Sequence, residues 1–273
     1  MLKITDISLR MGHRQILQAV SLHARPGGVT VLAGPNGAGK SSLFKLIAGE
    51  RKASAGSIEL HGKPLHDYRP RELARLRAVL PQHTSLHFAY PVAEIVAMGR
   101  LPYREPAARS RKIALEALEL TGAAQFAHTG YLRLSGGEQQ RVQLARVLAQ
   151  IWEPAGAPRL LLLDEPTASQ DLAHQYEVLS IARRFASRET AVVAILHDLN
   201  LAAQVADQLV FLKAGQVVAA GAMDDTLRPK TVQETFGLAV RILPHPDLPC
   251  PLVVPAIPRY APLSISQSQP IPL

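Results

Sequence analysis

Three segments of the chain combine residue types that suit phosphate chemistry, and the first is residues 34–41 (GPNGAGKS). It follows the apolar run 29–33 and fits the pattern G-x-x-x-x-G-K-S/T, in which glycines let backbone N–H groups curl around phosphate oxygens. The helix predicted at 41–48 adds its positive dipole end. Lys40 would contact the β- and γ-phosphates, and the Ser41 hydroxyl would ligate Mg²⁺. The pattern predicts a nucleotide site made of Gly34, Pro35, Asn36, Gly37, Ala38, Gly39, Lys40, Ser41 and Ser42.

The second and third segments place polar side chains directly after other apolar runs. Residues 160–163 are the most hydrophobic stretch of the chain, and Asp164 and Glu165 follow them. Asp164 is suited to holding Mg²⁺ through water, and Glu165 to polarising an attacking water. Residues 191–196 end in His197, and this position, more than the residue type, favours a contact with the γ-phosphate region. Because parallel strands of an open α/β sheet deliver chemistry at their carboxyl ends, we expect the three segments to meet at one edge.

The remaining pattern predicts elements that hold these segments in place. Residues 1–10 alternate between apolar and polar side chains, which is typical of a strand. Helical periodicity replaces strand signals over residues 85–150, and residues 152–158 (WEPAGAP) are predicted to form a surface loop. The expected helices of this inserted subdomain are 92–99, 107–120 and 137–150.

The end of the chain differs from the rest in composition. Residues 244–273 are rich in proline, which excludes a helix there and predicts a poorly ordered end. We therefore expect one domain over residues 1–243, followed by a Pro-rich tail.

Composition narrows the class of protein. A chain of 273 residues with 47% apolar side chains can bury the core of one large α/β domain. The single cysteine, Cys250, excludes an internal disulfide framework and fits a reducing compartment. Neither a secretory signal nor an apolar run of about 18 residues occurs, so we expect a soluble chain. The net charge of +8 includes a cluster that predicts a solvated face beside phosphates or lipid head groups, formed by Arg69, Arg71, Arg75 and Arg77.

A fourth segment, residues 134–141 (LSGGEQQR), resembles the LSGGQ signature of ABC ATPases. The resemblance covers about residues 1–240 and places six motifs in the order of that family. They are the phosphate-binding loop, Gln82 in VLPQH, the signature, the acidic pair Asp164–Glu165, a D-loop at 168–171 (ASQD) and His197. The implied fold is an α/β P-loop NTPase core with a mixed or parallel sheet, an N-terminal antiparallel β portion and an inserted α-helical subdomain.

The resemblance also implies how the motifs act. Glu165 would activate water, while Lys40, Mg²⁺ and His197 stabilise the transferred phosphoryl group. Gln82 would be a further Mg²⁺ ligand and would couple the γ-phosphate to movement of the membrane partner. In this family two subunits pair head to tail, so we expect a homodimer with two ATP sites. The signature of one subunit would close on ATP held by the other through Ser135, Gly136, Gly137 and Glu138.

Further partners and a location follow from the same resemblance. We expect two integral-membrane permease subunits, a periplasmic substrate-binding protein acting through them, and no nucleic acid. The chain would sit peripherally on the cytoplasmic face of the bacterial inner membrane. The permease is expected to dock near residues 83–105, with reversal of the charge of Arg100 as a test of that contact.

Three positions depart from the usual pattern of the family. The adenine base commonly stacks on an aromatic residue near position 11, where this chain has Met11, followed by His13. Either Met11 would cover the base through its sulfur and apolar contact, or His13 would stack on it. Glu138 and Gln170 stand where Gln and Leu are more usual, and neither change removes a phosphate ligand.

The cargo is narrowed by resemblance alone. Residues 90–102 (YPVAEIVAMGRLP) look like a stretch of importers for ferric siderophores, vitamin B12 and haem. Glu138 with the two glutamines that follow it, the insert 151–158 and the tail 241–255 look like the haem-importer branch. We therefore expect a motor for haem import, with siderophore or vitamin B12 import as the alternative. A non-transport ABC ATPase acting on nucleic acid and an exporter motor are further alternatives, although long coiled-coil heptads and fused membrane spans are missing.

Overall fold

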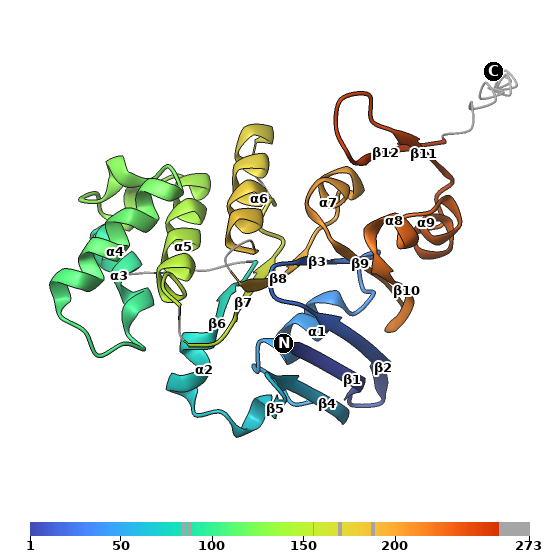
Figure 1. Ribbon diagram of the computed structural model, residues 1–273, viewed down its shortest axis with the longest axis horizontal. Coiled ribbons are helices and arrows are strands. Elements are labelled where there is room, and N and C mark those ends of the chain that lie inside the picture. Colours follow the sequence, from blue (N-terminus) through green and yellow to red (C-terminus); the bar gives the residue numbers. More distant parts are fainter. Residues whose placement is uncertain (83–85, 87–88, 155, 169–170, 187–188, 257–273) are drawn as a thin grey trace, which may run out of the picture.

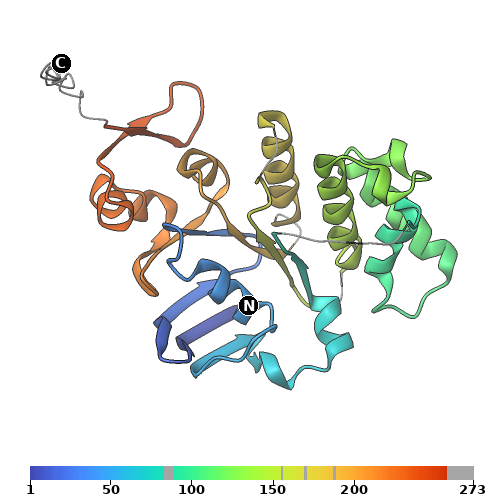
Figure 2. The same ribbon diagram turned by 180° about the vertical axis from the view of Figure 1, so that it is seen from behind.

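The protein is built around a six-stranded sheet with a layer on each face, shown from opposite sides in Figures 1 and 2. The computed structural model describes residues 1–82, 86, 89–154, 156–168, 171–186 and 189–256. All neighbouring strands are parallel except β10, which is antiparallel to β9. In spatial order the strands are β10 (Gln216–Ala222), β9 (Gln208–Lys213), β3 (Val29–Ala33), β8 (Thr190–Ile195), β7 (Arg159–Asp164) and β6 (Arg77–Leu80).

Successive residues of the central strands face two different cores. In β7, Leu161 and Leu163 lie in a core shared with helices α5 (Gly136–Gln150), α6 (Leu172–Ala186) and α7 (Leu199–Val205). Leu160 and Leu162 lie in the opposite core, with α1 (Lys40–Ile47), α2 (Pro70–Leu76) and the N-terminal strands. Burial on both faces explains why these strands appear in the sequence as unbroken apolar runs.

A second, antiparallel sheet covers one face of the central sheet. Its order is β2 (Arg14–Ala24), β1 (Leu2–Met11), β4 (Ala55–Leu60) and β5 (Lys63–Pro64), and the 3₁₀ turn η1 (Leu65–Asp67) follows. β1 pairs antiparallel with both β2 and β4. The predicted strand at the start of the chain and the predicted antiparallel portion are confirmed.

The predicted helical subdomain is confirmed as a lobe beside the central sheet (Figure 1). It has its own core, in which α3, α4 and α5 bury Val96, Ala117, Val142 and the ring of Tyr131. Both α3 and α4 start directly after a proline at the N-cap position, Pro91 and Pro106. The elements are α3 (Val92–Ala97), η2 (Met98–Arg100), α4 (Ala107–Leu120), η3 (Ala124–Phe126), η4 (Tyr131–Arg133) and α5.

The chain ends in two short helices and a hairpin, formed by α8 (Met223–Thr226), α9 (Pro229–Phe236), β11 (Val240–Pro244) and β12 (Pro251–Pro255). The side-chain amide of Asn200, on α7, donates to the carbonyl of Val253 at 3.2 Å and accepts its N–H at 2.7 Å. The predicted division between residues 243 and 244 runs through this hairpin, because β12 needs β11 as its pairing partner. Residues 257–273 lie outside the described residues.

No helix in the described part of the chain combines the length and apolarity needed to cross a membrane.

Candidate functional site

The phosphate-binding loop joins β3 to α1 and leaves the first turn of that helix open. The N-cap residue, Gly39, carries no side-chain cap, and the first turn of α1 contains no acidic residue. The unpaired N–H groups of a helix start attract an anion, and a carboxylate there would compete with it. Asn36 and Ser41 are exposed beside this turn, while Ala38 is buried. The predicted phosphate-binding residues therefore lie around one open helix end.

Two glycines of the loop are required by the chain's own backbone. Gly34 has a φ of +152°, and a Cβ atom there would lie 2.1 Å from the carbonyl oxygen of Leu212. Gly39 has a φ of +100°, and a Cβ atom would lie 2.7 Å from Cδ2 of Leu17. At Gly34 any other residue would combine a strained backbone with a clash against a backbone carbonyl, whereas at Gly39 the left-handed backbone is the main requirement for glycine. The loop is therefore held in shape by the strands beneath it.

Lys40 is folded back across the loop. Its Nζ donates hydrogen bonds to the carbonyl oxygens of Gly34 at 2.7 Å and Pro35 at 3.0 Å. Burial lowers the pKa of Lys40, and the nearby carboxylates of Glu165 and Asp164 oppose this shift. The ammonium group thus lies between the loop and the acidic pair, where a nucleotide phosphate would give it a stronger partner.

Asp164 is the last residue of β7, and its carboxyl group is buried. Its Oδ1 atom has no hydrogen-bond partner among the described residues. Burial, followed by the charge of Glu165, raises the pKa of Asp164 from 3.8 to about 6, while Lys45 acts in the opposite direction. A buried acceptor that faces no donor fits a hard divalent cation such as Mg²⁺, which prefers oxygen ligands. Lys45 was not predicted, although it lies one helical turn after Ser41 on α1.

Glu165 is held between two of the other predicted catalytic side chains, Gln82 and His197. Its Oε2 accepts a hydrogen bond from Nε2 of Gln82 at 2.6 Å, and its Oε1 lies 2.6 Å from Nε2 of His197. Because a carboxylate only accepts, the imidazole donates in this contact. The backbone of Glu165 is left-handed, with a φ of +49°, at the residue where the chain leaves β7. Since Lys40 also lies near this acidic pair, the predicted meeting of the three segments at one sheet edge is present in the fold.

The signature residues form the start of α5. Ser135 is the N-cap residue, and its N–H and hydroxyl donate to Oε2 of Glu138 at 2.7 and 2.9 Å. These hydrogen bonds, backbone first, lower the pKa of Glu138. Glu138, which stands where Gln is more usual, thus completes a capping box with Ser135. None of the hydrogen bonds or ion pairs among the described residues joins Ser135 or Glu138 to the phosphate-binding loop of the same chain.

The remaining predicted site positions are Met11 and the D-loop. Met11 is exposed, and its sulfur accepts a hydrogen bond from Nη1 of Arg51 at 3.1 Å. Among the described residues, no hydrogen bond joins it to the phosphate-binding loop. Of the D-loop, Ser169 and Gln170 lie outside the described residues. Within the described part of the chain, no three His, Cys, Asp or Glu residues gather as a metal site.

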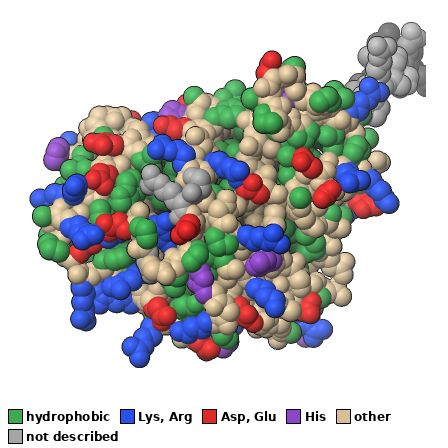
Figure 3. Space-filling model, viewed as in Figure 1, with side chains coloured by type: hydrophobic (Ala, Val, Ile, Leu, Met, Phe, Trp, Pro, Cys, Tyr) green, Lys and Arg blue, Asp and Glu red, His purple; other side chains and the backbone are tan. Residues whose placement is uncertain are grey.

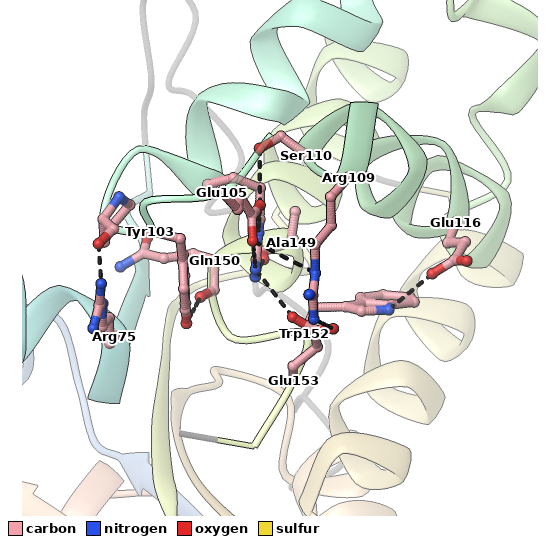
Figure 4. Close-up of polar contacts among 12 residues, drawn as sticks. Arg75, Tyr103, Glu105, Arg109, Ser110, Glu116, Ala149, Gln150, Trp152 and Glu153 are labelled. Carbon is pink, nitrogen blue, oxygen red and sulfur yellow. Dashed lines mark hydrogen bonds and ion pairs between the residues drawn. The ribbon is translucent and has the colours of Figure 1, made fainter. Parts of the chain in front are cut away.

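Arg100 does not lie on a docking surface. It is buried, and its guanidinium binds Glu105 at 2.8 Å, Glu153 at 3.1 Å and the carbonyl of Ala149 at 2.9 Å. It also lies 3.8 Å from the ring centre of Tyr103. We call Arg100, Tyr103, Glu105 and Glu153 the Arg100 network, and Figure 4 shows Glu105 and Glu153 close together beside Arg109. Reversing the charge of Arg100 would disrupt the fold, so it cannot test a permease contact as expected from the sequence.

The fold and the contacts of Lys40, Asp164 and Glu165 define a P-loop ATPase. Comparison with known proteins gives the family: the model for the ABC transporter family matches residues 17–168. The chain belongs to this family. The most similar relatives include a hemin import ATP-binding protein, HmuV, from Gloeobacter violaceus, 52% identical over 93% of this chain and 94% of the relative. The protein of the same name from Rhizobium meliloti is 45% identical over 93% of this chain and 98% of the relative.

Solved structures agree with this family. A transporter described as of the metal-chelate type, in an inward-facing conformation, matches with a TM-score of 0.78 and 26% identity. The match covers 94% of this chain and 97% of that chain. A dimeric bacterial ABC transporter cassette matches with a TM-score of 0.72 and 27% identity, over 82% of this chain and 99% of that chain. The predicted fold class and the resemblance to ABC ATPases are confirmed.

Proposed function

We propose that the chain hydrolyses ATP through Glu165 and thereby powers import of haem through a partner permease. The observation that carries the catalytic part is the placement of Glu165 between Gln82 and His197, at 2.6 Å from each. A carboxylate so held is suited to orient a water for in-line attack on the γ-phosphate. His197 and Lys40 would stabilise the charge that develops on the transferred group.

Mg²⁺ is the second part of the proposal. Asp164, Ser41 and Gln82 would hold it, Asp164 through water, and the unpartnered buried oxygen of Asp164 supports this assignment. The ion would neutralise charge on the β- and γ-phosphates. When ATP is bound, Lys40 would exchange its two backbone carbonyls for phosphate oxygens.

A homodimer would complete the site. At Gly136 and Gly137 an added Cβ atom would meet nothing within 4 Å, so this chain's own packing does not demand glycine there. Both glycines and Ser135 are exposed at the start of α5. Open backbone N–H groups at a helix start suit an approaching phosphate, which supports a partner subunit carrying ATP. The dimeric state of a similar cassette supports the same arrangement.

The membrane partner is proposed from exposed apolar side chains. Tyr90, Met98 and Leu101 are exposed within the segment expected to dock, and Leu101 is 76% exposed. Exposed aromatic and aliphatic residues are typical anchors of protein interfaces. We infer attachment to two permease subunits at the cytoplasmic face of the inner membrane, with a periplasmic binding protein acting through the permease.

Haem as cargo is supported by the identity to relatives named for hemin import. The test is ATP turnover in liposomes that hold the chain with its permease. The binding protein is added loaded with haem, a ferric siderophore or cobalamin. Stimulation and uptake with haem alone are expected. Stimulation by another chelate would overturn the cargo and keep the motor, and basal turnover without any stimulation would overturn the transport proposal.

A further inference from the structure

Four arginines from two elements line one cavity far from the catalytic residues. This arginine cavity, of about 610 Å³, lies between α2, the loop that follows η2, and the loop that precedes β7. Its cationic lining consists of Arg69, Arg71, Arg75 and Arg104. Figure 3 shows Lys and Arg side chains gathered along the lower left edge of the face, where Figure 1 places this region. Three of these arginines come from the basic cluster in the sequence, and Arg77 does not line the cavity.

Two of the arginines are fixed by a single backbone carbonyl. Nε of Arg71 and Nε of Arg75 donate to the carbonyl oxygen of Pro102 at 2.8 and 3.0 Å. The guanidinium of Arg75 also lies 5.2 Å from the ring centre of Tyr103, whose hydroxyl donates to the carbonyl of Gln150 at 2.8 Å. Arg75, Tyr103 and Gln150 lie together at this junction in Figure 4. Pre-oriented guanidinium groups lose less freedom on binding an anion than free side chains do.

The cavity lacks a matching negative charge among the described residues. None of its four arginines forms an ion pair there, whereas Arg100 and Arg109 nearby are both paired with Glu105 and Glu153. The one carboxylate in the lining, Glu72, lies 3.5 Å from Nζ of Lys63. Water screens part of the repulsion among the four guanidinium groups, because Arg69, Arg71 and Arg104 are exposed, and a bound anion would offset the rest.

The cavity is separate from the nucleotide site. Its walls include Gly156 and Ala157, which precede β7, whereas Asp164 ends that strand. Six strand residues span on the order of 20 Å, so a nucleotide phosphate on Lys40 cannot reach it.

We propose that the arginine cavity binds a phosphate-bearing anion, either a soluble phosphate ester or the head group of an anionic phospholipid. Planar guanidinium groups bind phosphate oxygens in pairs, and their number here exceeds what one carboxylate neutralises. The proposal goes beyond ATP hydrolysis and does not depend on the identity of the cargo.

The test uses the full-length chain with ADP and Mg²⁺ present, so that the phosphate-binding loop is filled. Inorganic phosphate is titrated while the fluorescence of Trp152, the single tryptophan, is followed. In a second arm the chain is sedimented with phosphatidylglycerol–phosphatidylcholine vesicles and with phosphatidylcholine alone. A saturable fluorescence change would identify a soluble phosphate, and binding confined to phosphatidylglycerol vesicles would identify a lipid head group.

The variant R69Q/R104Q removes two charges without breaking the hydrogen bonds to Pro102. We expect it to weaken the binding at least about tenfold, since each lost contact to a charged group has roughly that effect. The matched control R25Q/R241Q removes two exposed charges elsewhere and should stay within about twofold. Both variants should keep the melting temperature and basal ATP turnover of the wild type. Equal weakening in the two variants, or no binding in either arm, would overturn the proposal.

Discussion

The pKa values of buried charged groups shift in opposite directions at the catalytic edge and in the Arg100 network. At the catalytic edge (Lys40, Asp164, Glu165 and His197), burial raises the pKa of Asp164 to about 6 and lowers that of Lys40. In the Arg100 network burial acts to lower the pKa of Arg100, but the hydrogen bond and charge of Glu105 outweigh it, so the pKa is raised. The hydrogen bond from Arg100 in turn lowers the pKa of Glu105.

The difference separates a site that awaits a ligand from one that is already complete. Burial disfavours the charged forms of Lys40 and Asp164, and ATP with a cation would compensate both. Arg100 and Glu105 already compensate each other, so this network needs nothing further and holds the loop before β7 against the helical lobe. Charged groups are buried in both regions. The pKa shifts favour the neutral forms at the catalytic edge and the charged forms in the Arg100 network.

The largest expected effect comes from breaking the completed network. Arg100→Met leaves the carboxylate of Glu105 without its buried partner, which typically lowers the free energy of unfolding by about 3–5 kcal/mol. Urea denaturation measures this change. Arg109→Met removes a neighbouring, exposed arginine and should change stability little. Equal stability of the two variants would show that the buried pairing of Arg100 does not stabilise the fold more than an exposed ion pair does.

Next in size is the loss of the catalytic carboxylate. Glu165→Gln should still bind ATP but turn over at least ~100-fold more slowly, the scale of losing a transition-state stabiliser. Steady-state phosphate release and ATP binding measure the two properties. Glu119→Gln, which replaces an exposed carboxylate on α4 by a carboxamide, serves as the control. Near-normal turnover of Glu165→Gln would remove Glu165 from the proposed mechanism.

The buried charge of Asp164 should make the free energy of unfolding depend on pH. The folded pKa of Asp164, about 6, lies above the ordinary 3.8, so ionisation of this group destabilises the fold. The penalty is absent well below pH 3.8 and complete above about pH 6. Asp164→Asn should therefore be more stable than the nucleotide-free wild type at pH 7, by about 3 kcal/mol, and nearly equal to it at about pH 3. Denaturation at several pH values tests this, and a difference independent of pH would contradict it.

The smallest effect is expected at the exposed capping box. Glu138→Ala removes the acceptor of the Ser135 N–H and should lower the melting temperature by about 2–4 °C. Glu138→Gln keeps a side-chain oxygen at the same place and should retain most of the stability. Calorimetry compares the two variants with the wild type. A larger loss for Gln than for Ala would show that the box does not stabilise α5.

The sequence by itself determined the residues whose roles follow from local pattern. Residues 34–41 predict their own loop and helix, because the requirement for glycine and the helix dipole act within a few residues. The unbroken apolar runs at 160–163 and 191–196 predict strands buried on both faces, and so the edge where Glu165 and His197 meet.

Only the tertiary structure decided how charges separated along the chain compensate one another. Arg100 and Glu153 are 53 residues apart, and nothing in either segment indicates that they meet or that Arg100 is buried. Arg71 and Arg104 share one cavity for the same reason, since packing of α2 against the loop after η2 brings them together. Local sequence carries propensity and periodicity, whereas burial and the neighbours of a charge depend on contacts between distant segments.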